Sequence, residues 1–161
     1  MKKSILLIFL GVLASCGVAK NPVASKAIIT SVCPESGTCT IEIMKDKSLS
    51  VKIDDLKRPY YTLEVMPGRV VVKYTYTKNR NPDYADDGYT EEVIFETDEN
   101  FTQIDADKNK LLFGVQCFCR GKAGFYKVPD ALVTYKNENL HISLPAIVDG
   151  QLTRAVNIEF E

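Results

Sequence analysis

Cysteines are the residues of this chain best suited to covalent or metal chemistry, and there are five of them. Apart from Cys16 near the amino terminus, they form a C-x₅-C pair, Cys33 and Cys39, and a C-x-C pair, Cys117 and Cys119. An even number of cysteines indicates disulfides in an exported domain, and the amino-terminal segment described below predicts export. Zinc sites built from four thiolates commonly use C-x₂-C spacing in both halves, and neither pair has it. We therefore expect structural disulfides, with free buried thiols and a four-thiolate metal or redox-active site as alternatives.

The pairing of these four cysteines can be narrowed by strand parity. Cys117 and Cys119 share one strand face with the alternating apolar residues before them, and Cys39 shares a face with those after it. Cα atoms two residues apart on a strand are about 6.5 to 7 Å apart, at or beyond the limit for a disulfide. We therefore expect Cys33 and Cys39 each to bridge to one member of the later pair, which would close loops of roughly 80 residues.

An acidic segment is the second candidate for chemistry. From residue 79 to residue 92 there is one arginine against five carboxylates, namely Asp83, Asp86, Asp87, Glu91 and Glu92. Such a segment binds Ca²⁺ or meets a basic partner, or it is a solvated loop, which is its commonest role. Paired carboxylates also carry out glycoside hydrolysis, so a hydrolase of envelope glycans that uses Asp86, Asp87 and Glu91 is a further alternative.

Other groups for catalysis are scarce. His141, the single histidine, alternates with apolar neighbours and is expected on the polar face of a strand. No G-x-S-x-G or comparable setting for a nucleophile is present. We therefore predict no catalytic residue, no cofactor and no bound metal ion.

Tyrosines crowd around the acidic segment. Six lie within about thirty residues: Tyr60, Tyr61, Tyr74, Tyr76, Tyr84 and Tyr89. Tyrosine supplies a stiff contact area with a polar tip and is common on recognition surfaces, although it also favours β-strands. The candidate binding residues are Tyr74, Tyr76, Tyr84, Asp86, Asp87 and Tyr89.

The amino-terminal segment has the pattern of an export signal. Lys2 and Lys3 precede an apolar run from Ile5 to Ala14. Ten helical residues rise about 15 Å, half of the roughly 30 Å hydrocarbon core, so this run is too short to span a membrane. Leu13-Ala14-Ser15-Cys16 then resembles the lipobox of bacterial lipoproteins.

This resemblance implies a processing route and a location. Residues 1–15 would be a signal peptide removed before Cys16, whose acylation would anchor the protein, since each buried CH₂ contributes about 0.8 kcal/mol. Lipoprotein sorting implies the outer membrane, because Gly17 stands where inner-membrane retention usually places Asp. No acidic residues follow Cys16 directly, which favours the periplasmic face over the cell surface. Residues 16–26 are expected to be the lipidated cysteine and a flexible tether, followed by a single domain over residues 27–161.

The sequence pattern of that domain predicts an all-β fold. Apolar and polar residues alternate in eleven short segments, as half-buried strands require. The segments are Ala27–Val32, Thr40–Met44, Leu49–Ile53, Tyr61–Met66, Val70–Thr77, Thr90–Thr97, Leu111–Cys119, Gly124–Val128, Leu132–Tyr135, Leu140–Leu144 and Val156–Glu161. Turn signals separate several of them, including one at Pro67-Gly68, and no stretch has sustained helical periodicity. We predict an antiparallel β-sandwich or closed β-barrel of about 8 to 11 short strands.

Charge and composition narrow the function. Removal of residues 1–15 takes away two lysines, leaving Lys+Arg 18 against Asp+Glu 21 and a net charge of −3, so no nucleic-acid partner is expected. We expect a non-catalytic, lipid-anchored cell-envelope protein that is structural or binds a protein, a glycan or a small ligand. A thiol- or metal-handling protein that uses the four cysteines is the first alternative, and the glycan hydrolase is the second.

Overall fold

The computed structural model describes most of the predicted domain. It describes residues 27–34, 36–84, 86–104 and 110–161. The signal peptide, Cys16 and the tether lie outside the described residues and stay predictions. Within the described ranges the regular structure is entirely β, and no helix there is long and apolar enough to cross a membrane.

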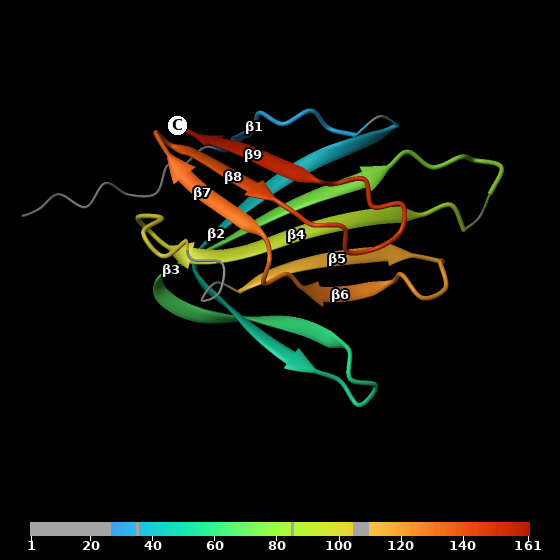
Figure 1. The fold of residues 1–161 in the computed structure, drawn as a ribbon, viewed down its shortest axis with the longest axis horizontal. Helices are drawn as coiled ribbons and strands as arrows, with labels where there is room; N and C mark the ends of the chain where they lie inside the picture. The colour runs from blue at the N-terminus through green and yellow to red at the C-terminus, as the bar shows by residue number, and fades with distance from the viewer. Residues whose placement is uncertain (1–26, 35, 85, 105–109) are drawn as a thin grey trace, which may run out of the picture.

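Two antiparallel sheets make up the described part of the domain (Figure 1). Their strands are β1 (Ala27–Ile29), β2 (Gly37–Ile53), β3 (Pro59–Lys78), β4 (Tyr89–Asp98), β5 (Leu111–Cys117), β6 (Gly124–Lys127), β7 (Leu132–Lys136), β8 (Asn139–Ser143) and β9 (Ala155–Phe160). One sheet has the order β2-β3-β4-β5-β6, and the other has the order β1-β9-β8-β7. The predicted all-β antiparallel class is confirmed. The closed-barrel alternative is wrong for the described strands, because they form two separate sheets.

Apolar side chains of both sheets meet in one core. In β4, Val93 and Phe95 enter this core, whereas Ile94 points to the opposite face of the sheet. From the four-stranded sheet, Ile142 and Ile158 enter the same core. The alternation in the sequence therefore corresponds to inward and outward faces. The shared core holds the strand ends, and thus the loops between them, in a fixed arrangement.

Strands β2 and β3 are longer than predicted. Thr40–Met44 and Leu49–Ile53, predicted as separate strands, both lie in β2, which has 17 residues. Strand β3 has 20 residues and runs through Pro67-Gly68, so the turn predicted there is wrong. The turn between the two strands lies instead at Asp54–Arg58, where the Asp54 carboxylate accepts hydrogen bonds from the Arg58 backbone N–H and Nε.

A bulge explains the turn signal inside β3. The register of the β2–β3 pair shifts between Lys45 and Lys47. Asp46 there has φ 54°, and Gly68 opposite has φ 79°, a conformation that glycine adopts without steric cost. The Gly68 N–H donates to Asp46 Oδ1 at 3.1 Å. The paired strands therefore bend here and remain paired.

Beyond the bulge, residues 47–65 form a two-stranded arm that folds back toward the five-stranded sheet (Figure 1). Leu49 packs with Ile94 in a second apolar cluster on the outer face of this sheet. The Tyr61 ring meets Phe125 of β6 edge to face, with ring centroids 5.2 Å apart. Strand β4 is therefore buried on both faces.

A buried carboxylate fastens the arm to the sheet. Glu96 of β4 accepts hydrogen bonds from the Ser48 hydroxyl at 2.9 Å and from the Leu49 N–H. Its oxygens also lie 2.7 Å from Arg69 Nη2 and 3.1 Å from Lys110 Nζ. Burial opposes ionisation of this carboxyl, but the surrounding donors outweigh it, so the pKa of Glu96 is below its ordinary value of 4.5.

Candidate functional site

A pocket of about 330 Å³ lies at one end of the sheets, where four separate segments meet; we call it the loop pocket. Antiparallel pairing explains the convergence, because β3 and β5 end where β4 begins, and Tyr89 pairs directly with Cys117. The lining residues are Lys78, Asp86, Asp87, Gly88, Tyr89, Cys117, Phe118, Cys119, Gly150 and Leu152. The loop pocket therefore brings together part of the acidic segment and the C-x-C pair.

The disulfide pairing differs from the predicted one. Cys33 is bonded to Cys39 and Cys117 to Cys119, with Cα–Cα distances of 5.8 and 5.2 Å. The predicted long-range bridges are wrong because Cys39 lies in β2 and Cys117 in β5, with β3 and β4 between them. Three inter-strand spacings amount to about 14 Å, twice the largest Cα separation that a disulfide tolerates.

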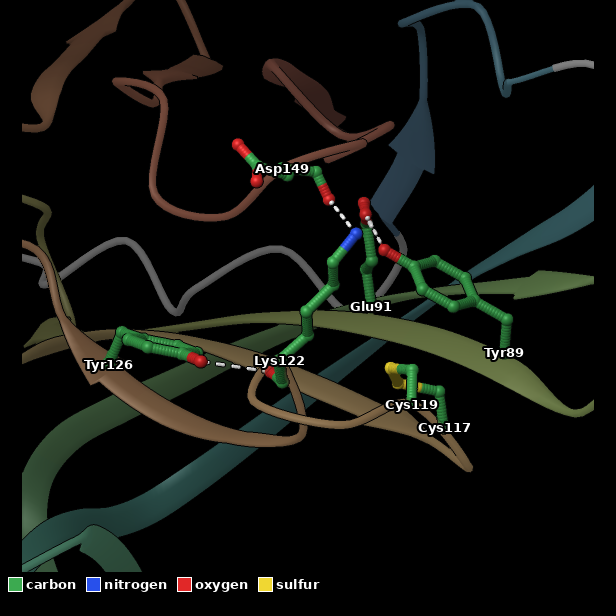
Figure 2. Close-up of a disulfide and its surroundings, with 7 residues drawn as sticks. All are labelled: Tyr89, Glu91, Cys117, Cys119, Lys122, Tyr126 and Asp149. Atoms are coloured by element: carbon green, nitrogen blue, oxygen red, sulfur yellow. Dashed lines mark hydrogen bonds between the residues drawn. A yellow bond between two sulfur atoms is a disulfide. The ribbon is translucent and has the colours of Figure 1, made fainter.

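The local C-x-C bridge forms because β5 ends at its first cysteine. The chain bends at Phe118, which shortens the separation from the extended value to 5.2 Å. Cys117 still packs against the core as its parity predicts, while the Phe118 side chain is 86% exposed. Figure 2 shows the bridge at the end of β5, below Tyr89 and Glu91.

The two bridges contribute differently to stability. In the chain-entropy model a three-residue loop such as Cys117–Cys119 adds about 1.6 kcal/mol, and a seven-residue loop such as Cys33–Cys39 adds about 2.4 kcal/mol. Cys33 and Cys39 also pack against the core, and Cys39 Sγ lies 2.9 Å from the Tyr74 hydroxyl. The Cys33–Cys39 bridge is thus the more strongly integrated of the two.

A carboxylate behind the loop pocket joins the two sheets. Glu91 of β4 is completely buried and accepts hydrogen bonds from the Leu152 N–H at 2.8 Å and the Thr153 N–H at 2.6 Å. The Tyr89 hydroxyl donates to the same carboxylate at 2.6 Å (Figure 2). Burial, followed by this hydrogen bond to a carboxylate, raises the pKa of Tyr89 far above its ordinary value. These contacts give Glu91 a positioning role, because they fix the segment that carries Leu152.

An ion pair also orders part of the acidic segment, residues 79–92, at the loop pocket. Lys78 Nζ lies 3.0 Å from Asp87 Oδ1, and the Asn81 N–H donates to Asp87 Oδ2 at 2.9 Å. These contacts, the backbone hydrogen bond first, lower the pKa of Asp87. Asp86 is exposed beside this pair. Asp87 is therefore ionised at neutral pH where it lines the pocket.

Hydrogen bonds also hold the segment that follows the C-x-C bridge. Lys122 Nζ donates to the Asp149 carbonyl oxygen at 2.8 Å, and the Tyr126 hydroxyl donates to the Lys122 carbonyl oxygen at 2.9 Å (Figure 2). The first bond links the loop after β5 to the turn before Gly150. Both walls of the loop pocket are thereby positioned.

The predicted tyrosine surface separates into different environments. Tyr89 lines the loop pocket, whereas Tyr84 is exposed on the acidic loop outside it. Tyr76 is buried in the core. Tyr74 is also buried and lines a second pocket of about 400 Å³, on the other side of Leu152. The tyrosines therefore do not form one recognition surface.

Residues that the sequence analysis did not select complete the loop pocket: Lys78, Gly88, Phe118, Gly150 and Leu152. A signal was available for Phe118 alone. It alternates with two cysteines on a predicted strand, so its parity places it opposite the core face. The other four are brought in by tertiary contacts between distant loops.

The alternative prediction of a metal site gains no support from the described residues. Within the described ranges, no group of three or more His, Cys, Asp and Glu residues is arranged to hold a metal ion. The four cysteines form two separate disulfides, one near the start of β2 and one at the end of β5. His141 is half-buried on its strand and hydrogen-bonded through Nδ1 to Asn157 Oδ1.

Comparison with known proteins found no match for this chain. No family model, curated protein or solved structure matches it.

Proposed function

We propose that the mature protein is a non-catalytic, lipid-anchored binding protein of the cell envelope, held by acylated Cys16 at the periplasmic face of the outer membrane. Its domain is a β-sandwich, and its ligand site is the loop pocket. The sandwich assignment is supported by the core that both sheets share. The anchor is supported by the lipobox-like residues that end at Cys16.

The observation that carries the proposal is the convergence of charged, aromatic and apolar side chains in one hollow. Small-ligand sites are concave, have volumes of about 300 to 1,000 Å³ and place a few polar groups among apolar ones. The loop pocket, at about 330 Å³, lies at the lower end of this range. Its frame is fixed by hydrogen bonds at Glu91 and Lys122.

The lining defines the class of ligand. Asp86 and Asp87 contribute negative charge, and Lys78 offsets one of the two through its ion pair. Phe118 and Leu152 offer apolar contact and are 86% and 45% exposed. We therefore propose a small cationic ligand with an apolar body, such as a primary amine or the side chain of a basic peptide.

An NMR titration tests this assignment. Benzylamine, benzyl alcohol and benzoate share one ring and differ in charge, so each is added separately to ¹⁵N-labelled protein. We expect benzylamine to shift the amide signals of Gly88, Phe118 and Leu152 the most, and we expect Asp86→Asn to weaken this binding. Glu159→Gln, on the exposed surface of β9, is the matched control. Equal shifts with all three probes, or shifts confined to other residues, would contradict the proposal.

The anchor is tested independently of the pocket. Cells that produce the wild type or Cys16→Ala are labelled with an alkyne-tagged fatty acid, and the purified proteins are compared. We expect label on the wild type only, together with outer-membrane fractionation. An unlabelled wild type would remove the anchor from the proposal and leave the pocket assignment intact.

A further inference from the structure

The Cys117–Cys119 disulfide lines the loop pocket. We infer that Cys117–Cys119 is an exchangeable disulfide that accepts two electrons from a protein dithiol carrying positive charge, while Cys33–Cys39 remains a structural bridge. This activity goes beyond the proposed binding of a small cation, and it does not depend on the identity of that ligand.

The Cys117–Cys119 bridge lies where strand pairing in the sheet ends. The ladder between β4 and β5 ends at the Tyr89–Cys117 pair, and the ladder between β5 and β6 ends earlier, at Val115. Phe118 and Cys119 are therefore outside every strand. Opening the bridge breaks no strand pairing, so the reduced protein can keep its fold.

The Cys117–Cys119 bridge also borders the loop pocket. Both cysteines line the loop pocket, and Phe118 between them is 86% exposed. Thiol–disulfide exchange requires a thiolate to reach a sulfur atom directly, so access decides which of two bridges reacts first. In contrast, Cys39 is paired with Tyr76 inside the β2–β3 ladder, and its sulfur contacts the Tyr74 hydroxyl.

Carboxylates in the same pocket favour a positively charged partner. Asp86 and Asp87 line the same pocket, and Lys78 is the one cation among its lining residues. These two carboxylates repel an anionic thiol such as glutathione and attract a basic segment. Phe118 and Leu152 add an apolar contact that a protein segment covers on docking.

The exchange transfers two electrons in two successive thiolate attacks. A partner thiolate attacks one of the two sulfur atoms, the Sγ–Sγ bond breaks, and a mixed disulfide forms while the released cysteine takes up a proton. The second partner thiolate then attacks the partner's own sulfur in the mixed disulfide and releases the other cysteine, which is also protonated. Two electrons and two protons pass from the partner dithiol, which becomes a disulfide, to Cys117 and Cys119.

Differential alkylation of the lipidated protein in detergent tests the choice of bridge. Samples are incubated with dithiothreitol, quenched with iodoacetamide and mapped by mass spectrometry, with near-ultraviolet circular dichroism recorded in parallel. We expect Cys117 and Cys119 to be labelled at least about tenfold faster than Cys33 and Cys39, with the dichroism unchanged. Equal rates for both pairs, labelling that requires loss of the dichroism, or four thiols labelled before reductant is added would overturn the inference.

Two peptides of the same dithiol sequence, one flanked by lysines and one by glutamates, test the partner. At low ionic strength we expect the lysine peptide to be oxidised about fivefold faster, and we expect the difference to vanish at 1 M salt, where the Debye length is about 3 Å. Cys117→Ser/Cys119→Ser should lose the reaction, and Cys33→Ser/Cys39→Ser should retain it. If the latter variant does not fold, the wild-type peptide map decides. Equal oxidation of both peptides at low salt would refute the basic partner.

Discussion

Replacing Glu91 with glutamine tests whether one buried carboxylate fixes the wall of the loop pocket. Glu91 Oε1 accepts from the Tyr89 hydroxyl and the Leu152 N–H, and Oε2 accepts from the Thr153 N–H at 2.6 Å. Glutamine retains one acceptor oxygen, but its amide NH₂ then faces the N–H of Thr153. A buried donor is left without an acceptor, and a charged hydrogen bond is lost.

The expected loss in the free energy of unfolding follows from these contacts. A hydrogen bond to a charged group contributes about 1.5 to 3 kcal/mol, and an unsatisfied buried donor costs about 1 to 3 kcal/mol. Because the two effects overlap in part, we expect Glu91→Gln to lower the free energy of unfolding by about 3 kcal/mol. For a domain of this size, that corresponds to a fall in Tm of about 6 to 12 °C.

Urea unfolding monitored by circular dichroism and tyrosine fluorescence measures this loss, since the chain has no tryptophan. Hydrogen exchange at the Leu152 amide reports the local effect, and we expect its protection to fall by more than that of the strands. The matched control is Glu159→Gln, which makes the same chemical change at an exposed position and should cost less than about 0.5 kcal/mol. A loss for Glu91→Gln no larger than that of the control would refute the positioning role.

Three further predictions concern the stability of the two sheets. The lowered pKa of Glu96 means that its ionised form adds stability that is complete above its ordinary value of 4.5 and is lost as the pH falls through the folded-state pKa. Urea titrations from neutral to acidic pH should therefore show a smaller acid-induced loss for Glu96→Gln than for the wild type. Cys33→Ser/Cys39→Ser should lower the free energy of unfolding by about 2.4 kcal/mol under oxidising conditions, measured by the same titration. Gly114→Ala would place a methyl group 2.5 Å from Cε1 of Phe125, and we expect thermal unfolding to show a loss of about 1 to 3 kcal/mol.

Alternation located the strands because nearly all of them have two different faces. Leu140–Leu144 and Val156–Glu161 were predicted within one residue of the bounds of β8 and β9. In β4, however, the pattern does not reveal that both faces of the strand are buried. Glu91 and Glu96 are polar residues on opposite faces of this strand, and both are buried. Sequence alone would assign each to solvent, since the groups that satisfy them come from segments far away in the chain.

The bend in β2 and β3 could not be predicted from neighbouring residues either, because it depends on a residue far away in the chain. Pro67-Gly68 has the chemistry of a turn, and the positive φ of Gly68 agrees with it. What keeps the strands paired is Asp46, 22 residues earlier, whose side chain accepts the Gly68 N–H. The same dipeptide therefore ends a strand in one setting and bends it in another.

The candidate site was partly predictable. Asp86, Asp87 and Tyr89 were selected as binding residues, and they do line the loop pocket with the C-x-C pair. Tyr74 and Tyr76 were selected for their chemistry although they share a strand face with Val70 and Val72, and both are buried. Their position on the strand predicts burial, and a residue on the core face of a strand is not available for recognition.

The order of strands, more than the spacing of cysteines, decided which thiols could meet. When consecutive strands pair as successive hairpins, each further strand adds about 4.8 Å, so cysteines on the first and fourth strands are out of reach however well their faces agree. A C-x-C pair in such a sheet can bond only within itself, which requires the strand to end at its first cysteine, and β5 ends at Cys117. The bridge must then lie where strand pairing stops and the loops begin. That position leaves Cys117–Cys119 open to exchange, whereas Cys39, within the β2–β3 ladder, is held by its neighbours.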